Sequence, residues 1–166
     1  KETVAMTTSN HTRIIDASTA HRVDPHWAYG FPEYRKGQHD RIAAARLVSN
    51  PGCYPTGFLG LVAPLVAACL IPEDWPYTVN AVSGYSGGGK ALIERFESDA
   101  GADIGFRTYG LDLSHKHVPE MQIHAGLGLA PIFSPAVVRA FRGMMVEVPL
   151  PISVMPGSDS PEEMRD

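Results

Sequence analysis

The chain has 166 residues, of which 44% are hydrophobic and 19% charged, with a formal net charge of -4 at pH 7. This is the composition of a globular protein with one core, and no run of Lys and Arg forms the basic stripe of a nucleic-acid-binding protein. The longest apolar run, residues 58–71, contains Pro64 and is too short to span a bilayer, so we expect no membrane segment. Two cysteines do not make a disulfide framework, which favours the reducing cytoplasm.

The first half of the chain predicts short strands and helices joined by ordered segments. In chain order, we expect a polar, helical or frayed segment over residues 1–12, a buried strand over 12–19, an ordered loop over 21–33, a helix over 38–46 and a strand over 47–50. The predicted strands are rich in β-branched residues, whereas the loop holds two prolines, a glycine and three aromatics.

The second half begins with a helix that is apolar nearly all round and is therefore expected to be buried. In chain order, we predict this helix over residues 56–70 with a kink at Pro64, a strand over 77–83, a flexible loop over 84–90, a helix over 91–98 and a strand-like section over 105–152, clearest at 144–150. Strands that alternate with helices, followed by a strand-rich section, predict an α/β or mixed α+β fold.

Cys53 lies in the stretch SNPGCYPTG, residues 49–57, where Gly52 permits a sharp turn and Pro55 suits the first turn of a helix. A thiol at a helix N-terminus faces unpaired N–H groups and the positive end of the helix dipole, and both stabilise thiolate. We therefore interpret Cys53 as a nucleophile. Cys69 lies inside the apolar helix and is expected to be a buried, inert thiol.

The stretch HKHVPE, residues 115–120, offers acid–base groups to such a thiolate. On an extended segment, His115 and His117 would face the same side, and a carboxylate such as Glu120 could orient an imidazole. Two alternatives stay open from these residues alone. One is a zinc site of both histidines and a cysteine, for which further ligands at zinc-like spacing are missing, and the other is a pair of surface histidines beside a proline.

The glycine-rich stretch GYSGGGKA, residues 84–91, is a near miss for a phosphate-binding loop. Ala91 stands where that loop has the hydroxyl that holds magnesium, which argues against a nucleoside triphosphatase. Consecutive glycines still let backbone N–H groups approach a phosphate or cofactor, and Lys90 adds charge, although a flexible turn explains the glycines equally well. A thiol, a histidine and this loop together suggest acyl chemistry on a phosphate-bearing substrate.

Four segments of the chain resemble one family in that family's order. SNPGCYPTG resembles the active-site signature of the N-acetyl-γ-glutamyl-phosphate reductases, and AHRVDPHWAYGFPE, VNAVSGYSGGGK and HKHVPE resemble further segments of the same family. The matches extend from Thr12 to Leu150, and the glycine loop is most similar to the shorter-chain branch.

The resemblance implies a reaction in which Cys53 attacks a γ-acyl phosphate, expels inorganic phosphate and forms a thioester. NADPH then delivers a hydride, which gives N-acetylglutamate semialdehyde. His115 matches the family's acid–base histidine, expected to help ionise Cys53 and to protonate the departing group. Tyr109 falls where the family has an active-site tyrosine, and His117 and Glu120 match motif neighbours that are expected to orient or contact the substrate.

The resemblance also assigns Ser86, Gly87 and Gly88 to contact with the nicotinamide cofactor. On charge grounds, Arg22 and Lys90 are our candidates for the substrate's phosphate or carboxylate. The expected partners are a small acyl phosphate, inorganic phosphate and further copies of the chain in a homodimer or homotetramer, with no metal, nucleic acid or membrane.

The dinucleotide fingerprint G-x-G-x-x-G is absent from this sequence. In the family that the chain resembles, this fingerprint belongs to an N-terminal nucleotide-binding domain. The resemblance therefore implies that residues 1–19 are the tail of a Rossmann domain and that residues 20–166 are a mixed α+β catalytic and dimerisation domain of the semialdehyde dehydrogenase type, truncated at its C-terminus.

Four alternatives use some of the same residues. The first is aspartate-semialdehyde dehydrogenase, and a more remote one is glyceraldehyde-phosphate dehydrogenase; both form a cysteine thioester that a hydride reduces. The residues around their cysteine, however, resemble Asn-Cys-Thr rather than Gly-Cys-Tyr-Pro-Thr. A thiol hydrolase would use Cys53 and His115 without a cofactor. The chain could also be a non-catalytic dimerisation module.

Overall fold

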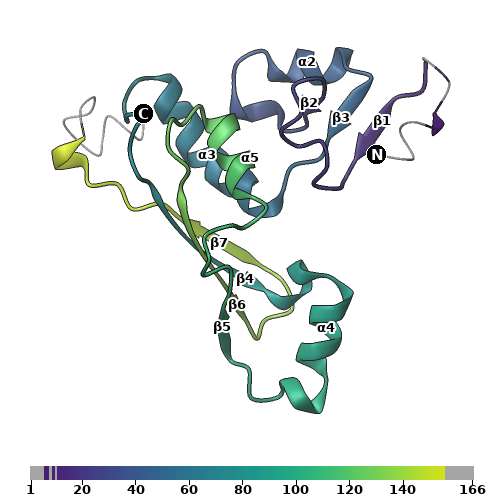
Figure 1. The fold of residues 1–166 in the computed structure, drawn as a ribbon, viewed down its shortest axis with the longest axis vertical. Helices are drawn as coiled ribbons and strands as arrows, with labels where there is room; N and C mark the ends of the chain where they lie inside the picture. The colour runs from purple at the N-terminus through teal and green to yellow at the C-terminus, as the bar shows by residue number, and fades with distance from the viewer. Residues whose placement is uncertain (1–5, 8, 10, 156–166) are drawn as a thin grey trace.

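The computed structural model describes residues 6, 7, 9 and 11–155 and contains two β-sheets with helices between them (Figure 1). The predicted mixed α/β class is confirmed. The segment predicted over residues 1–12 falls mostly outside the described residues. No helix in the described part of the chain is both long enough and apolar enough to cross a membrane.

A small parallel sheet forms the N-terminal part of the molecule. Its strands are β1 (Ile14–Asp16), β3 (Leu47–Ser49) and β2 (Ala28–Tyr29), in that spatial order, and the 3-10 helix η1 (Pro32–Tyr34) and helix α2 (Gln38–Ala44) follow β2 in the chain. The predicted helix over 38–46 and strand over 47–50 are confirmed within two residues.

Two expectations for this part were wrong. The predicted buried strand over 12–19 is only three residues long, and its central residue, Ile15, is 74% exposed. The predicted loop over 21–33 contains β2, since Ala28 and Tyr29 pair with β3; both are buried, as is Trp27 before them. The domain boundary after residue 19 stays a prediction, and the pairing of β1 with β3 joins segments on either side of it.

A larger mixed sheet forms the other end of the molecule. Its strands are β5 (Phe106–Thr108), β6 (Ile132–Val138), β4 (Thr78–Gly84) and β7 (Met144–Glu147), in that order. Strand β4 runs parallel to β6, and the two outer strands are antiparallel to their neighbours. The 3-10 helices η2 (Tyr85–Gly88) and η3 (Asp99–Gly101) flank helix α4 (Lys90–Glu97), and η4 (Ile152–Val154) follows β7. The strand predicted over 77–83 and the helix predicted over 91–98 are confirmed.

Helix α3 (Cys53–Ala67) and helix α5 (Val118–Ala125) pack on each other between the two sheets. Their core contains Phe58 and Leu59 from α3 and Met121 from α5, all with no exposed surface. Helix α5 corrects the expectation of a strand-like section over 105–152: Pro119 suits its first turn, and Gly126 ends it in the left-handed conformation.

The long helix also differs from its prediction. It is not buried all round, because Leu61 is 49% exposed, and it continues through Pro64 to Ala67. Cys69 lies beyond its end, exposed and at φ 58, in a Schellman motif in which Leu70 N–H bonds the Leu65 carbonyl. The expected buried thiol at position 69 is therefore wrong.

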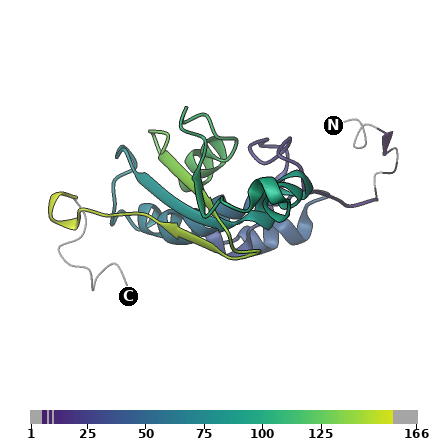
Figure 2. The same cartoon turned by 90° about the horizontal axis from the view of Figure 1, so that it is seen from below.

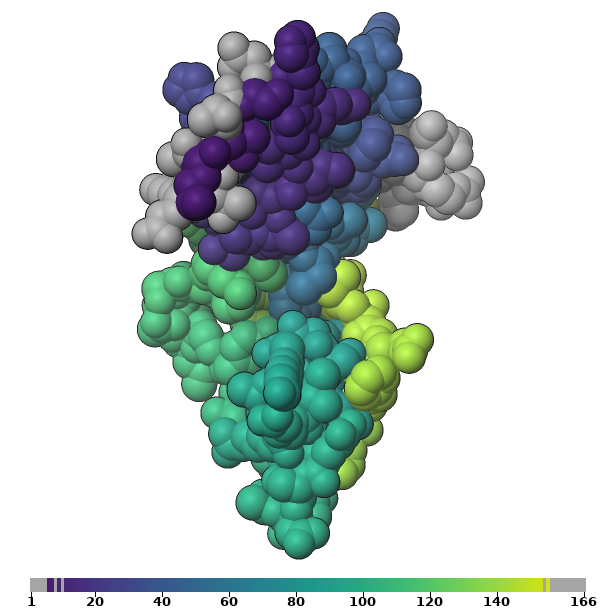
Figure 3. Space-filling view, turned by 90° about the vertical axis from the view of Figure 1, so that its right-hand side faces the viewer, coloured from purple at the N-terminus to yellow at the C-terminus, as the bar shows by residue number. Residues whose placement is uncertain are grey.

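The molecule is flattened, as the view from below shows (Figure 2). Seen from its side, it narrows to a waist between the N-terminal part and the part that carries β4 and α4 (Figure 3). The candidate site takes residues from both sides of this waist.

Candidate active site

Cys53 occupies the first turn of α3, directly after the end of β3 and the residues Asn50, Pro51 and Gly52. The helix begins three residues before the predicted start, because the Gly52 carbonyl already accepts the backbone N–H of Thr56 at 3.0 Å and its hydroxyl at 2.8 Å. The thiol is exposed and unpaired. Cys53 therefore lies where helix N–H groups lack internal partners, as the sequence predicted.

Gly52 serves a purpose different from the one that we expected. Its φ of -69° and ψ of 150° are open to any residue, so no special turn requires glycine. A Cβ at this position would instead lie 2.7 Å from Nε2 of His117 and 2.9 Å from Nη1 of Arg22. Glycine is needed because an imidazole and a guanidinium pack directly against the turn.

His115 and His117 face one another with ring centroids 4.7 Å apart. The segment is not extended as expected, because His117 has helical backbone angles and precedes α5. The backbone N–H of His117 donates to Nδ1 of His115 at 3.2 Å, so a neutral His115 ring carries its proton on Nε2. Burial, and then the charge of Lys116, lower the pKa of His115.

His117 is only 5% exposed and, among the described residues, its Nδ1 has no hydrogen-bond partner. Burial first, and then the charges of His115 and Arg22, lower the pKa of His117 to about 3. The ring is therefore neutral near pH 7. No group of three or more His, Cys, Asp or Glu in the described part of the chain could hold a metal ion.

Glu120 is 1% exposed and lies behind the nucleophile turn. Its Oε1 accepts the backbone N–H of Gly52 and the hydroxyl of Tyr29, each at 2.7 Å, and its Oε2 lies 3.5 Å from Nη1 of Arg22. None of these partners in the described structure is a histidine, which corrects the expectation that Glu120 orients an imidazole. Burial raises the pKa of Glu120, although the hydrogen bonds from Gly52 and Tyr29 oppose the rise.

Of the two cations predicted to bind the substrate, only Arg22 lies at the site. Its Nε donates to the Asn50 carbonyl at 2.8 Å and its Nη2 to the Ala17 carbonyl at 3.2 Å. The side chain of Lys90 is 90% exposed, lies 3.7 Å from Glu94 and is not among the residues around the pocket. The structure thus does not bring Lys90 to Cys53.

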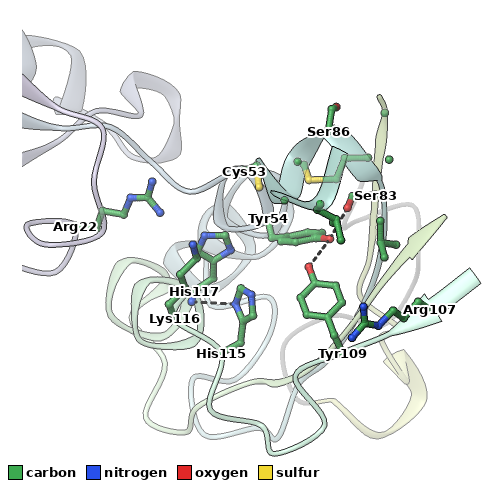
Figure 4. A pocket seen from close by; sticks show the side chains of 17 residues that line it. Arg22, Cys53, Tyr54, Ser83, Ser86, Arg107, Tyr109, His115, Lys116 and His117 are labelled. Carbon is green, nitrogen blue, oxygen red and sulfur yellow. Dashed lines mark hydrogen bonds between the residues drawn. The ribbon is translucent and has the colours of Figure 1, made fainter. Parts of the chain in front are cut away.

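A chain of hydroxyl groups passes beside Cys53 (Figure 4). Tyr109 donates to the Tyr54 hydroxyl at 3.0 Å, which donates to the Ser83 hydroxyl at 2.8 Å. Burial, followed by the hydrogen bond to Tyr54, raises the pKa of Tyr109. Tyr109 was predicted from the family resemblance, whereas Tyr54 and Ser83 were missed.

The glycine-rich loop is a 3-10 helix, η2, rather than the flexible loop that we expected. Two of its glycines are required by the fold: a Cβ on Gly84 would lie 2.7 Å from the Ala140 carbonyl oxygen, and Gly89 has a φ of 76°. A Cβ on Gly88 would overlap the side chain of Leu92, which would have to move. A Cβ on Gly87 would approach nothing closer than Ser83 Oγ, at 3.8 Å, so internal packing does not explain glycine there.

These residues surround one pocket of about 850 Å³. Cys53, His115, His117, Arg22, Tyr109 and residues 86–88 all line it. The charged residues among its described lining are Arg22, Arg107 and Lys116, with no carboxylate. Arg107 and Lys116 were not predicted as site residues. Lys116 could have been found from its place between the two predicted site histidines of HKHVPE. The pocket suits an anionic ligand of small-molecule size.

Residues 53–164 match the family model of the semialdehyde dehydrogenase dimerisation domain, and the chain belongs to this family. The match begins at Cys53 itself. The chain is also 59% identical over 154 residues, or 91% of its length, to proteins named N-acetyl-gamma-glutamyl-phosphate reductase from Brucella ovis, Brucella canis and Brucella suis. It covers 50% of each of them, so it spans about half the length of these curated relatives. The family resemblance predicted from four motifs is thereby confirmed.

Proposed function

We propose that the protein containing this chain reduces N-acetylglutamyl 5-phosphate to N-acetylglutamate 5-semialdehyde, with NADPH as reductant and a thioester on Cys53. The observation that carries the proposal is that Cys53 and His115, 62 residues apart in the sequence, line one cationic pocket. The name of the Brucella relatives supports the choice of acyl phosphate.

The first stage uses residues at the N-terminus of α3. The thiolate of Cys53 attacks the acyl carbon, a C–S bond forms, and the C–O bond to phosphate breaks. Negative charge develops on the acyl oxygen, and the Nε2–H of neutral His115 is a suitable donor to it. A general-base role for His115 would require its other tautomer, which would break the contact between Nδ1 and the His117 N–H. The tautomer therefore supports hydrogen-bond donation over proton abstraction.

The second stage needs a reductant and a surface to hold it. Residues 86–88 would hold NADPH, which would supply the hydride that reduces the thioester to the aldehyde and frees the Cys53 thiolate. Ser86, Gly87 and Gly88 line the pocket, and the missing side chain at Gly87 leaves the backbone uncovered for close approach of a cofactor ring. Overall, acyl phosphate, NADPH and one proton give aldehyde, NADP⁺ and hydrogen phosphate.

The substrate carries negative charge at both ends, on its phosphate and on its carboxylate. Arg107 and Lys116 line the pocket, and neither side chain has a hydrogen-bond or ion-pair partner within the described residues. Arg22 is largely engaged by backbone carbonyls and Glu120 but still lines the pocket. We assign substrate anions to these three cations and withdraw Lys90 from that role.

Two further aspects belong to the same proposal. We expect the protein to form a homodimer or homotetramer, because the matched family model is a dimerisation domain. We place it in the cytoplasm, since both cysteines are free and two exposed thiols suit a reducing compartment.

The test is NADPH oxidation by the full protein with N-acetylglutamyl phosphate, compared with β-aspartyl phosphate and with Cys53→Ser. We expect oxidation with the first substrate only, and a covalent acyl adduct on wild type but not on Cys53→Ser. Preference for β-aspartyl phosphate would favour an aspartate-semialdehyde dehydrogenase. Acyl-phosphate hydrolysis without NADPH oxidation would indicate a thiol hydrolase, and a folded but inert oligomer would indicate a dimerisation module.

A further inference from the structure

Glu120 and Tyr29 lie outside the pocket lining, yet they meet behind the turn that presents Cys53. We propose that they are positioning residues: the Glu120 carboxylate, fixed by the Tyr29 hydroxyl, holds the Gly52 amide and thereby sets where the Cys53 thiol points. This inference rests on the proposed function only in taking Cys53 as the nucleophile.

The contacts of Glu120 come from three separate segments. Tyr29 belongs to β2, Gly52 to the nucleophile turn and Arg22 to the loop after β1, while Glu120 itself is on α5. Burying a carboxylate is costly unless hydrogen-bond donors replace the lost water. Moving the Gly52 amide, the Tyr29 hydroxyl or the Arg22 guanidinium away from Glu120 would therefore be unfavourable, and this cost holds all three in place. The nucleophile turn is consequently fixed to α5 rather than left as a free loop.

Tyr29 is itself immobilised. Its ring is 1% exposed and stacks on His124 with centroids 3.7 Å apart. His124, one helical turn after Glu120, donates from Nε2 to the Arg22 carbonyl at 2.6 Å. Helix α5 therefore holds both partners of Glu120: His124 packs on the ring of Tyr29 and bonds the backbone of Arg22.

The other side of the turn is closed as well. The imidazole of His117 and the guanidinium of Arg22 pack where a Cβ of Gly52 would be. With the Gly52 amide held from behind and its Cα face covered, the Pro51–Gly52 peptide has little freedom to rotate. Attack on a bound acyl carbon depends on sub-ångström placement of the nucleophile, so this restraint acts on the chemical step more than on substrate binding.

Tyr34 provides a matched control. It is buried, packs edge-to-face on Tyr29 at 5.6 Å, and its hydroxyl has no hydrogen-bond partner among the described residues. Tyr29→Phe and Tyr34→Phe remove the same atom from the same aromatic cluster, but only the first removes a donor to Glu120. Glu120→Gln is the second test variant, because it keeps the shape and removes the charge.

Two readouts on the full protein test the proposal: amide hydrogen exchange at Gly52, and steady-state kinetics with N-acetylglutamyl phosphate. We expect Tyr29→Phe and Glu120→Gln to speed exchange at Gly52 and to lower kcat at least about tenfold with little change in KM. Tyr34→Phe should leave both unchanged.

Unchanged exchange at Gly52 in both test variants would overturn the inference. Faster exchange with an unchanged kcat would overturn the positioning role. An equal loss of kcat in Tyr34→Phe would also do so, because it would show a general effect of the aromatic cluster. The proposed function can fail separately. If the variants show the expected exchange at Gly52 but the wild-type protein reduces no acyl phosphate, the proposed function is refuted and the restraint on the turn is supported.

Discussion

Replacing Gly52 by alanine places a methyl group against two side chains of the site. The new Cβ would lie 2.7 Å from Nε2 and 2.8 Å from Cδ2 of His117, and 2.9 Å from Nη1 of Arg22. Neither neighbour can easily move, because His117 is buried against Tyr54 with ring centroids 5.8 Å apart, and Arg22 is bonded to two carbonyls and a carboxylate.

The expected cost follows from two opposing effects. Overpacking of this kind costs about 1–3 kcal/mol. The backbone angles of Gly52 suit alanine, so reduced freedom of the unfolded chain returns about 0.4–1 kcal/mol. We therefore expect Gly52→Ala to lower the free energy of unfolding by about 1.3 kcal/mol, the difference between the midpoints of these two ranges.

Urea unfolding of wild type, Gly52→Ala and Gly105→Ala measures this difference. Gly105 is the control, because a Cβ there meets no atom within 4 Å and its φ is not in the left-handed region. We expect the control to be as stable as wild type or slightly more so, with full activity. Stability and activity of Gly52→Ala equal to those of the control would refute the crowding argument.

The remaining predictions concern charge, pH and the hydroxyl chain. Arg107→Met should raise KM for the acyl phosphate about tenfold or more, whereas Lys90→Met should leave it unchanged; equal KM values in initial-rate assays would contradict the assignment. In the unfolded chain His117 takes up a proton below about pH 6.5, whereas in the folded chain it does so only near pH 3, because its pKa is lowered to about 3. The free energy of unfolding should therefore fall as the pH is lowered from about 6.5 to about 3. His117→Phe should flatten that fall in urea titrations, and an unchanged slope would argue against it. Tyr109→Phe should cost about 1 kcal/mol through the lost bond to Tyr54, measured against wild type at one pH.

Local patterns were sufficient for the elements whose signals are short in range. The thiol at a helix N-terminus, the strand before the glycine loop and the mixed α/β class were all predicted correctly. Helix α5 was missed although Val118, Met121 and Ala125 have helical spacing, because its eight residues make only about two turns, too few to establish a helical period. Strand β2 was missed because two residues are too few for any period.

The sequence by itself predicted the chemistry that we propose for this protein: a nucleophilic thiol, a histidine partner and a glycine-rich loop, ordered as in one family. Only the tertiary structure decided which polar groups serve that thiol. Glu120 meets Gly52 across 68 positions, Tyr29 across 91 and Arg22 across 98. Lys90, which looked equally suitable, faces solvent instead. Residue type limits what a side chain can do, but partners so distant in the chain are brought together by packing of the whole core, which no local pattern encodes.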